Sequence, residues 1–202
     1  MMKIAVLGAG GWGTAIAALL GERHRDVVLW ARTPSVAAEI AATRHNSRYL
    51  PEVRVPDGVV CTADLAAAVH GAGLVVIVCP SHAVRTVAAA AAPAVAAGAL
   101  VVSAVKGLEV GSLKRMSEVI AEEIPAVAGR IVALSGPNHA EEVGRRQPSA
   151  TVAASPSRPA AEAVQDVFMA PYFRVYTNPD IIGVELGGAL KNIIALGAGV
   201  AE

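Results

Sequence analysis

Short apolar runs alternate with helix-like segments along the first two thirds of the chain. Strands are predicted at residues 3–7, 27–30, 74–79, 100–105 and 131–134, and helices at residues 12–20, 35–42, 63–69, 81–92 and 113–123. Residues 74–78 (LVVIV) are apolar on both faces, which is typical of parallel strands that helices cover on both sides. The alternation therefore predicts an α/β protein with a Rossmann-type, doubly wound, mostly parallel sheet.

The pattern changes in the last part of the chain. A strand at residues 150–153, a helix within residues 158–168 and β-like residues at 173–176 extend the predicted sheet. After the sequence NPD at residues 178–180, apolar and small residues recur at helical spacing. We interpret residues 1–180 as a Rossmann-type domain, and residues 181–202 as the first helix of a helical C-terminal domain that this sequence lacks.

Composition narrows the class of protein. The chain has 202 residues, 54% of them hydrophobic and 17% charged, and its formal net charge is zero. Because lysines and arginines are scattered, neither nucleic acid nor an anionic membrane is expected as a partner. Residues 65–84 and 86–105 have no acidic or basic side chains except histidine, but Pro80, Pro93 and glycines interrupt them, so no membrane span is predicted.

The cysteines bear on the cellular compartment. Cys61 and Cys79 lie in apolar runs without the spacing of metal ligands or of a redox pair. Both are expected to be small core residues, and no metal site is predicted. This favours a reducing, cytoplasmic compartment.

The strongest local motif is GAGGWG at residues 8–13, which matches G-x-G-x-x-G directly after a predicted strand and at the start of a predicted helix. Gly8 would permit the tight turn, Gly10 would let a pyrophosphate approach the backbone, and Gly13 would let the helix pack on the strand. The helix N-terminus offers unpaired N–H groups to the anion. This placement predicts a dinucleotide site, with an ordinary glycine-rich turn as the alternative.

The end of the second predicted strand bears on the choice of cofactor. NAD sites usually carry Asp or Glu there, whereas this chain reads LWART at residues 29–33. Arg32 favours a cofactor with a 2′-phosphate, because a guanidinium pairs bidentately with phosphate. We therefore expect NADP in preference to NAD; the alternative is that Arg32 is an ordinary surface residue.

Polar residues also follow other predicted strands, at residues 79–82, 103–107 and 134–140. Ligands of open α/β sheets bind beyond the carboxyl ends of the strands, so these residues are candidates for contacts. Ser81 and His82 can equally be a helix cap and a surface histidine. Lys106 would place an ammonium at the rim of the cleft, where a phosphate or a carbonyl would lie.

The last predicted helix carries a lysine among small residues. Lys191 shares one face with Val184, Gly187, Gly188 and Ala195. Such a groove admits either another helix or a ligand. Exclusion of water from it would favour the neutral form of Lys191, as proton transfer near neutral pH requires.

Several motifs in a fixed order give the chain a family resemblance. They are residues 8–15 (GAGGWGTA), 105–109 (VKGLE), 134–137 (LSGP), 173–180 (FRVYTNPD) and 185–192 (ELGGALKN). Together they resemble bacterial NAD(P)-dependent glycerol-3-phosphate dehydrogenases, along the whole chain. The resemblance implies interconversion of dihydroxyacetone phosphate and sn-glycerol 3-phosphate, a phospholipid precursor, by hydride transfer with NADP or NAD.

The resemblance also implies roles for individual residues. Besides the motif glycines Gly8, Gly10 and Gly13, the implied cofactor contacts are Gly11, Trp12, Arg32, Tyr49, Lys106 and Ala140. The implied substrate contacts are Lys106, Gly136, Asn138 and Lys191, with Lys191 as the general acid/base. The chain departs from the family at Asn138 and His139, where a hydroxyl residue and an aromatic residue are common.

Two other readings stay open. Another dehydrogenase with a helical C-terminal domain, of the 6-phosphogluconate or ketopantoate type, shares the glycine motif, but the KGLE and LKN elements argue against it. The other interpretation is a non-catalytic nucleotide-binding fragment, and the only feature that favours it is the expected lack of the helical C-terminal domain. The family's phosphate-binding arginine-asparagine element would lie beyond residue 202, so this chain is expected to bind cofactor but to turn over poorly. The resemblance also allows a homodimer.

Overall fold

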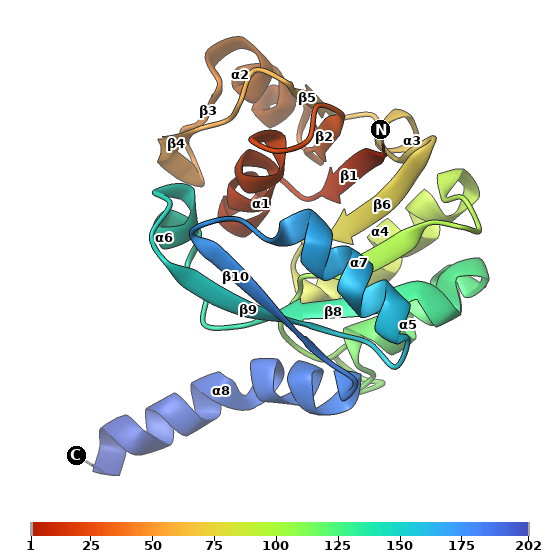
Figure 1. Cartoon of the computed structure of the whole chain (residues 1–202), viewed down its shortest axis with the longest axis vertical. Coiled ribbons are helices and arrows are strands. Elements are labelled where there is room, and N and C mark those ends of the chain that lie inside the picture. The colour runs from red at the N-terminus through yellow and green to blue at the C-terminus, as the bar shows by residue number, and fades with distance from the viewer. Residues whose placement is uncertain (1, 202) are drawn as a thin grey trace.

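The structure, a computed structural model, describes residues 2–201 and is built around one extended sheet (Figure 1). Its strands are β1 (Lys3–Leu7), β2 (Val27–Trp30), β5 (Val59–Thr62), β6 (Ala72–Ile77), β7 (Leu100–Ser103), β8 (Ile131–Ser135), β9 (Ser149–Ala154) and β10 (Phe173–Asn178). Among the described residues they form an eight-stranded sheet in the order β10-β9-β8-β7-β6-β1-β2-β5. The strands from β8 to β5 in this order are parallel, whereas β9 pairs with β8 in the antiparallel direction and with β10 in the parallel direction. The predicted Rossmann-type, mostly parallel sheet is confirmed.

Helices cover both faces of this sheet. The helices α1 (Gly11–Gly21), α2 (Pro34–Thr43) and α7 (Arg158–Phe168) pack on one face, and α3 (Leu65–Val69), α4 (Val84–Ala91) and α5 (Met116–Glu123) pack on the other. Residues Leu74–Ile77 of β6 are buried between the two layers. Both faces of that strand meet apolar side chains, which explains why its sequence shows no alternation.

The structure adds elements that the hydrophobic pattern did not predict. These are β5 at the sheet edge, a hairpin of β3 (His45–Asn46) and β4 (Leu50–Arg54), the short helix α6 (Ala140–Gly144), and the 3-10 helices η2 (Ala92–Ala94) and η3 (Pro125–Arg130). The helix predicted at residues 81–92 is divided into the 3-10 helix η1 (Ser81–Ala83) and α4. In β5, Val59 is buried but Val60 is 59% exposed. An edge strand of this kind has no continuous apolar run, so its pattern is weak. The apolar stretches at residues 65–84 and 86–105 are divided between short helices and the strands β6 and β7, as expected.

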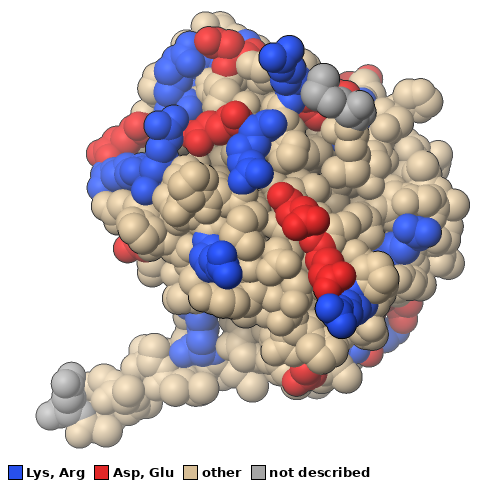
Figure 2. Space-filling model, in the orientation of Figure 1, with Lys and Arg blue, Asp and Glu red and all other residues tan. Residues whose placement is uncertain are grey.

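The helix α8 (Ile181–Ala201) leaves this layered body and projects away from it (Figure 1). Asp180 caps its first turn, because the Asp180 carboxylate accepts a hydrogen bond of 2.8 Å from the N–H of Gly183. From Leu190 onward the helix is exposed, and its projecting surface carries few charged atoms in the view of Figure 2. Among the described residues, α8 is the one helix with the length and apolar composition to cross a membrane, a weak criterion that core helices of soluble proteins also satisfy.

A buried carboxylate fastens α8 to the sheet domain. Glu185 is 7% exposed, and it accepts hydrogen bonds from the N–H and the hydroxyl of Ser117, at 2.8 and 2.6 Å, and from Arg115 at 2.8 Å. Ser117 lies in the first turn of α5, where the helix dipole stabilises negative charge. Glu185 therefore fixes the start of α8 against α5 and sets the position of the residues that follow.

Replacement of Glu185 by alanine should release the start of α8. The variant loses the three hydrogen bonds that the Glu185 carboxylate accepts, and each hydrogen bond to a charged group contributes about 1.5 to 3 kcal/mol, although Arg115 keeps its pair with Glu118. We expect the backbone amides of residues 184–188 to exchange more than about 100-fold faster in hydrogen-exchange mass spectrometry. Glu162→Ala, which removes an exposed pair with Arg158 on α7, is the control and should leave this exchange unchanged.

Candidate functional site

The glycine motif forms the turn between β1 and α1, and its glycines differ in what surrounds them. Gly8 has a φ of 134°, and a Cβ there would lie 3.0 Å from the carbonyl carbon of Val78. A Cβ on Gly13 would lie 1.8 Å from the carbonyl oxygen of Gly8. A Cβ on Gly10 would meet nothing within 4 Å. Gly8 and Gly13 are therefore required by the fold itself, whereas the absent side chain of Gly10 leaves open space.

That open space belongs to two cavities at the carboxyl ends of β1 and β6. The first, of about 340 Å³, is lined by Gly8, Gly10, Arg32 and Tyr49 among others. The second, of about 400 Å³, is lined by Gly10, Gly11, Trp12, Lys106 and Asn138. Both cavities share the walls Gly10, Val78, Cys79 and Pro80. They form one elongated site across the glycine turn, where the sheet order reverses direction around β1.

Arg32 lies in the wall of the first cavity, directly after β2. The lining of this cavity, as the structure describes it, includes Arg32 and His82 but no Asp or Glu. A ligand in it would therefore meet a guanidinium at the position where NAD sites usually place a carboxylate. Trp30 lines the same cavity, and its indole N–H donates to the carbonyl oxygen of Ala63 at 3.0 Å.

Gly11, which is part of the glycine turn, lies close to Tyr49 and Ala140. A Cβ on Gly11 would lie 3.0 Å from the carbonyl oxygen of Tyr49 and 3.6 Å from the Cβ of Ala140. Trp12 faces the second cavity, with its ring centroid 6.4 Å from that of Phe173. The structure thus brings together Gly11, Tyr49 and Ala140, which come from three separate segments of the sequence.

Lys106 and Gly136 meet between the loops that follow β7 and β8. The Nζ of Lys106 donates to the carbonyl oxygen of Gly136 at 2.9 Å. A Cβ on Gly136 would lie 2.7 Å from the carbonyl oxygen of Ala150, so a larger residue would disturb this contact. The side-chain NH2 group of Asn138 donates to the same oxygen of Ala150 at 2.8 Å. The side-chain oxygen of Asn138 takes no part in that bond.

Arg85 on α4 holds the loop that carries Lys106. Its guanidinium pairs with Glu109 at 2.7 Å, with Glu122 at 2.8 Å, and also with Glu123. Hydrogen bonds from Arg85 and Ser112 lower the pKa of Glu109 to about 2. Glu109 therefore stays ionised through the physiological pH range, and the loop keeps its attachment to α4 and α5.

The helix α8 brings Lys191 to the same region. A Cβ on Gly188 would lie 2.8 Å from the Oγ of Ser135 and 3.7 Å from the Cγ of Lys106, so the small residue lets α8 approach the two loops. Lys191, one turn further on, is exposed and donates to the Oδ1 of Asn192 at 2.8 Å. Partial burial and the charge of Lys191 lower the pKa of Lys106. Two ammonium groups that repel each other at the edge of a cavity are an arrangement that a bound anion would stabilise.

Cys79 lies in the wall of both cavities, but burial raises the pKa of its thiol to about 11. Burial raises the pKa of the Cys61 thiol to about 11 as well. Both thiols are therefore neutral near pH 7 and poor nucleophiles. Within residues 2–201, no three His, Cys, Asp or Glu side chains gather in a way that could hold a metal ion.

The residues named from the sequence fall into two groups by position. Those in the cavity walls are Gly8, Gly10, Gly11, Trp12, Arg32, Tyr49, Lys106 and Asn138. Gly13, Gly136 and Ala140 lie behind these walls, and Lys191 approaches from α8. Asn46, which is buried beneath the glycine turn, was not predicted from the sequence. It is a single asparagine among polar residues, and no motif or hydrophobic pattern marks it.

Comparisons with known proteins agree with this geometry. The family model of the N-terminus of NAD-dependent glycerol-3-phosphate dehydrogenase matches residues 3–161, and that of the C-terminus matches residues 180–202. The glycerol-3-phosphate dehydrogenase (NAD(P)+) of Moorella thermoacetica is 56% identical over 200 residues, which cover 99% of this chain and 59% of the relative. The chain thus spans about three fifths of the length of such relatives.

Solved structures give the same picture. The crystal structure of glycerol-3-phosphate dehydrogenase from Coxiella burnetii is similar with a TM-score of 0.90 and 36% identity, covering 99% of this chain and 61% of that chain. A ketopantoate reductase from Ralstonia eutropha JMP134 has a TM-score of 0.66 at 24% identity over 91% of this chain and 59% of that chain, which shows a shared fold alone.

Proposed function

The chain belongs to the NAD-dependent glycerol-3-phosphate dehydrogenase family, and from this we propose that it forms the cofactor-binding part of an oxidoreductase. The reaction is the interconversion of dihydroxyacetone phosphate and sn-glycerol 3-phosphate, which supplies a precursor of glycerophospholipids. One observation carries the proposal: α8 packs at Gly188 against Ser135 and Lys106, where a Cβ would lie 3.7 Å from the Cγ of Lys106, and this contact brings Lys191 toward the cavity that Lys106 lines.

The residues present fit a nicotinamide dinucleotide. The open space over Gly10 joins the two cavities and would be filled by a side chain at that position, so it suits a pyrophosphate. Gly8, Arg32 and Tyr49 would hold the adenosine part in the first cavity. Gly11, Trp12 and Lys106 would hold the nicotinamide part, with Ala140 packed behind Gly11, and Gly13 supports the turn. NADP is favoured over NAD by Arg32.

The second cavity would take the substrate beside the cofactor. Lys106, Asn138 and the backbone of Gly136 would bind and orient dihydroxyacetone phosphate, and the positive charges of Lys106 and Lys191 would attract its phosphate. When bound, the nicotinamide ring donates or accepts the hydride. Lys191 would donate a proton to the substrate oxygen during reduction and accept one from the hydroxyl group during oxidation.

We assign residues 1–180 to the dinucleotide-binding domain and residues 181–202 to the first helix of the substrate domain, in line with the separate family matches. A cytoplasmic location is supported by the free thiols of Cys61 and Cys79. A homodimer stays a prediction, which sedimentation equilibrium can test.

A substrate comparison tests the proposed reaction. The chain, extended by the C-terminal part of the Moorella thermoacetica relative, should oxidise NADPH or NADH in the presence of dihydroxyacetone phosphate, as followed by nicotinamide absorbance. Ketopantoate at the same concentration is the control and should give no turnover. Turnover of ketopantoate without turnover of dihydroxyacetone phosphate would overturn the proposal, because ketopantoate carries a carboxylate and a branched carbon chain in place of the phosphate.

Replacement of Arg32 by alanine should weaken the binding of NADPH far more than that of NADH. Hydrogen bonds to a charged group contribute about 1.5 to 3 kcal/mol, so the Kd of NADPH should rise about 10-fold or more, while that of NADH changes by less than about 3-fold. Titration of intrinsic fluorescence measures both, since Trp30 and Trp12 line the two cavities. Arg174→Ala on β10 is the control. Equal losses for both cofactors would mean that Arg32 does not bind a 2′-phosphate.

A further inference from the structure

A buried asparagine lies directly beneath the glycine turn. Asn46 is completely buried, and its side-chain amide donates one hydrogen bond to the carbonyl oxygen of Ala9, at 2.9 Å, and another to the hydroxyl of Thr14, at 2.8 Å. The hydroxyl of Thr14 in turn donates to the carbonyl oxygen of Gly10 at 2.8 Å. Both N–H donors of the amide are thus engaged, directly or through Thr14, in holding two consecutive carbonyl groups of the turn.

We infer that Asn46 is a positioning residue for the pyrophosphate-binding turn, an inference that rests on the proposed function. A trans peptide unit is planar, with its C=O and N–H pointing in opposite directions. Holding the oxygens of Ala9 and Gly10 on the buried side therefore directs the N–H groups of Gly10 and Gly11 away from it. Neither of these N–H groups donates a hydrogen bond to the backbone or side chains of residues 2–201. They are free to bind an anion at the N-terminus of α1.

The unpaired oxygen of the same amide supports this assignment. The Oδ1 of Asn46 is buried and has no hydrogen-bond partner among the described residues. Buried polar atoms without partners are uncommon and usually have a functional reason. Here the orientation that leaves Oδ1 unpaired is the one that presents both N–H donors to the turn. An aspartate at this position would lose both donors and set a carboxylate oxygen against the carbonyl of Ala9.

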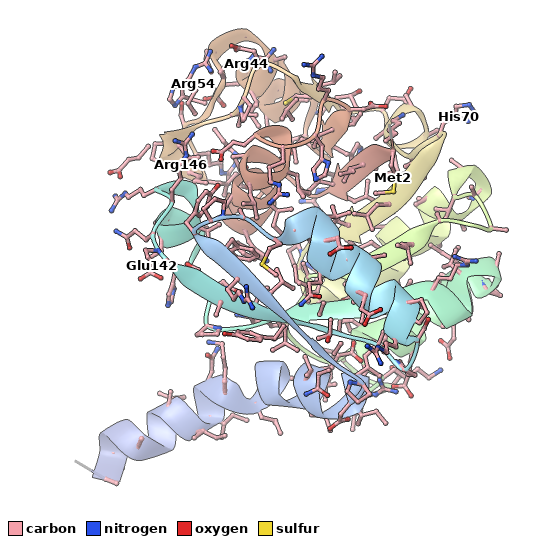
Figure 3. All side chains as sticks on the ribbon, in the orientation of Figure 1. Met2, Arg44, Arg54, His70, Glu142 and Arg146 are labelled. Carbon is pink, nitrogen blue, oxygen red and sulfur yellow. The ribbon has the colours of Figure 1, made fainter. Side chains whose placement is uncertain are left out.

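The segment that carries Asn46 is fixed from several directions. Arg44, which ends α2 in the left-handed conformation with a φ of 62°, donates to the carbonyl oxygen of Val59 at 2.7 Å. Arg44 and Arg54, labelled in Figure 3, both pair with Asp57. The N–H of Tyr49 donates to the carbonyl oxygen of Asn46 at 3.2 Å, and Tyr49 lines the first cavity. Asn46 therefore connects the glycine turn to Tyr49, another residue in the wall of the same cavity.

Two ligands separate positioning of the turn from general support of the fold. ADP-ribose contains the pyrophosphate, whereas adenosine contains only the part that fits the first cavity. In the Asn46→Asp variant we expect the Kd of ADP-ribose, measured by calorimetry, to rise about 10-fold or more, because misdirected N–H groups lose their bonds to a charged ligand. The Kd of adenosine, measured by ligand-observed NMR, should change by less than about 2-fold.

A matched pair at Thr14 keeps the test decisive if Asn46→Asp does not fold. Thr14→Val has the same shape without the hydroxyl and should show the same selective loss of ADP-ribose binding, while Thr14→Ser keeps the hydroxyl and should restore it. Asn178→Asp, at the end of β10, is the matched control and should bind ADP-ribose like the unaltered chain.

The outcomes distinguish this inference from the proposed function. Equal losses for adenosine and ADP-ribose, or unchanged ADP-ribose binding in Asn46→Asp or Thr14→Val, would overturn the positioning role while the dinucleotide site stands. An unaltered chain that binds neither ADP-ribose nor NADPH would overturn the dinucleotide site as well.

Discussion

Replacement of Gly10 by valine should abolish dinucleotide binding and leave the fold intact. Gly10 has a φ of −78°, which any residue can adopt, and a Cβ there meets nothing within 4 Å. The valine side chain would therefore not strain the domain, but it would occupy the space over the turn that joins the two cavities. We expect the Kd of NADPH to rise by roughly 100-fold or more, equivalent to about 2.8 kcal/mol. Calorimetry with NADPH measures the loss, and circular dichroism reports the fold.

Two other glycines provide controls for this experiment. Gly98→Val introduces the same side chain into open space near the start of β7, far from the cavities, and should bind NADPH normally. Gly13→Ala places a Cβ 1.8 Å from the oxygen of Gly8 and should instead disturb the packing of α1 on β1, with loss of stability. Normal NADPH affinity in Gly10→Val would show that no pyrophosphate passes over this turn.

Replacement of Lys191 by alanine should lower kcat by roughly 100-fold or more, with little change in the KM for NADPH. This is the size expected when a general acid/base is removed. The variant is measured as reduction of dihydroxyacetone phosphate, in a chain extended to the length of its relatives. Because Lys191 lies on α8 and is not in the cavity walls, cofactor binding should survive its loss.

Lys191→Arg distinguishes proton transfer from simple attraction of the substrate phosphate. Arginine keeps the positive charge but does not release its proton in proteins. If Lys191 transfers a proton, kcat should stay low in Lys191→Arg while the KM for dihydroxyacetone phosphate stays near that of the unaltered enzyme. An unchanged kcat in Lys191→Ala, or full activity in Lys191→Arg, would contradict the assigned role.

Much of the sheet could be predicted from the sequence because its central strands are buried on both faces. A short continuous apolar run such as β6 is best assigned as a buried strand when helix-like segments precede and follow it. The edge strand β5 and the hairpin of β3 and β4 could not be found in this way, because these strands are short and only one or two residues in each are buried. The helix α6 is five residues long and has no detectable periodicity.

The candidate site was predictable where it is local in sequence. The glycine turn needs only β1 before it and α1 after it, so its motif could be recognised. Lys106 and Lys191 each gave a signal, but their proximity depends on Glu185 and Gly188, which dock α8 against the sheet domain. Asn46 acts across 37 positions of sequence, and no local pattern indicates that contact. The roles of the individual site residues stay predictions.

The strand β1 lies between β2 and β6 in the sheet, and this affects the order in which the nucleotide site is completed during translation. The β1-α1-β2 unit is synthesised before β6, and the N–H of Gly8 donates to the carbonyl oxygen of Trp30 within that unit. The other wall of the turn is Val78, whose N–H donates to Leu7, and it is synthesised only after β6. A nascent chain shorter than this has no closed nucleotide site. A ligand stabilises only the state that binds it, so the cofactor can trap the completed domain but cannot guide its early folding.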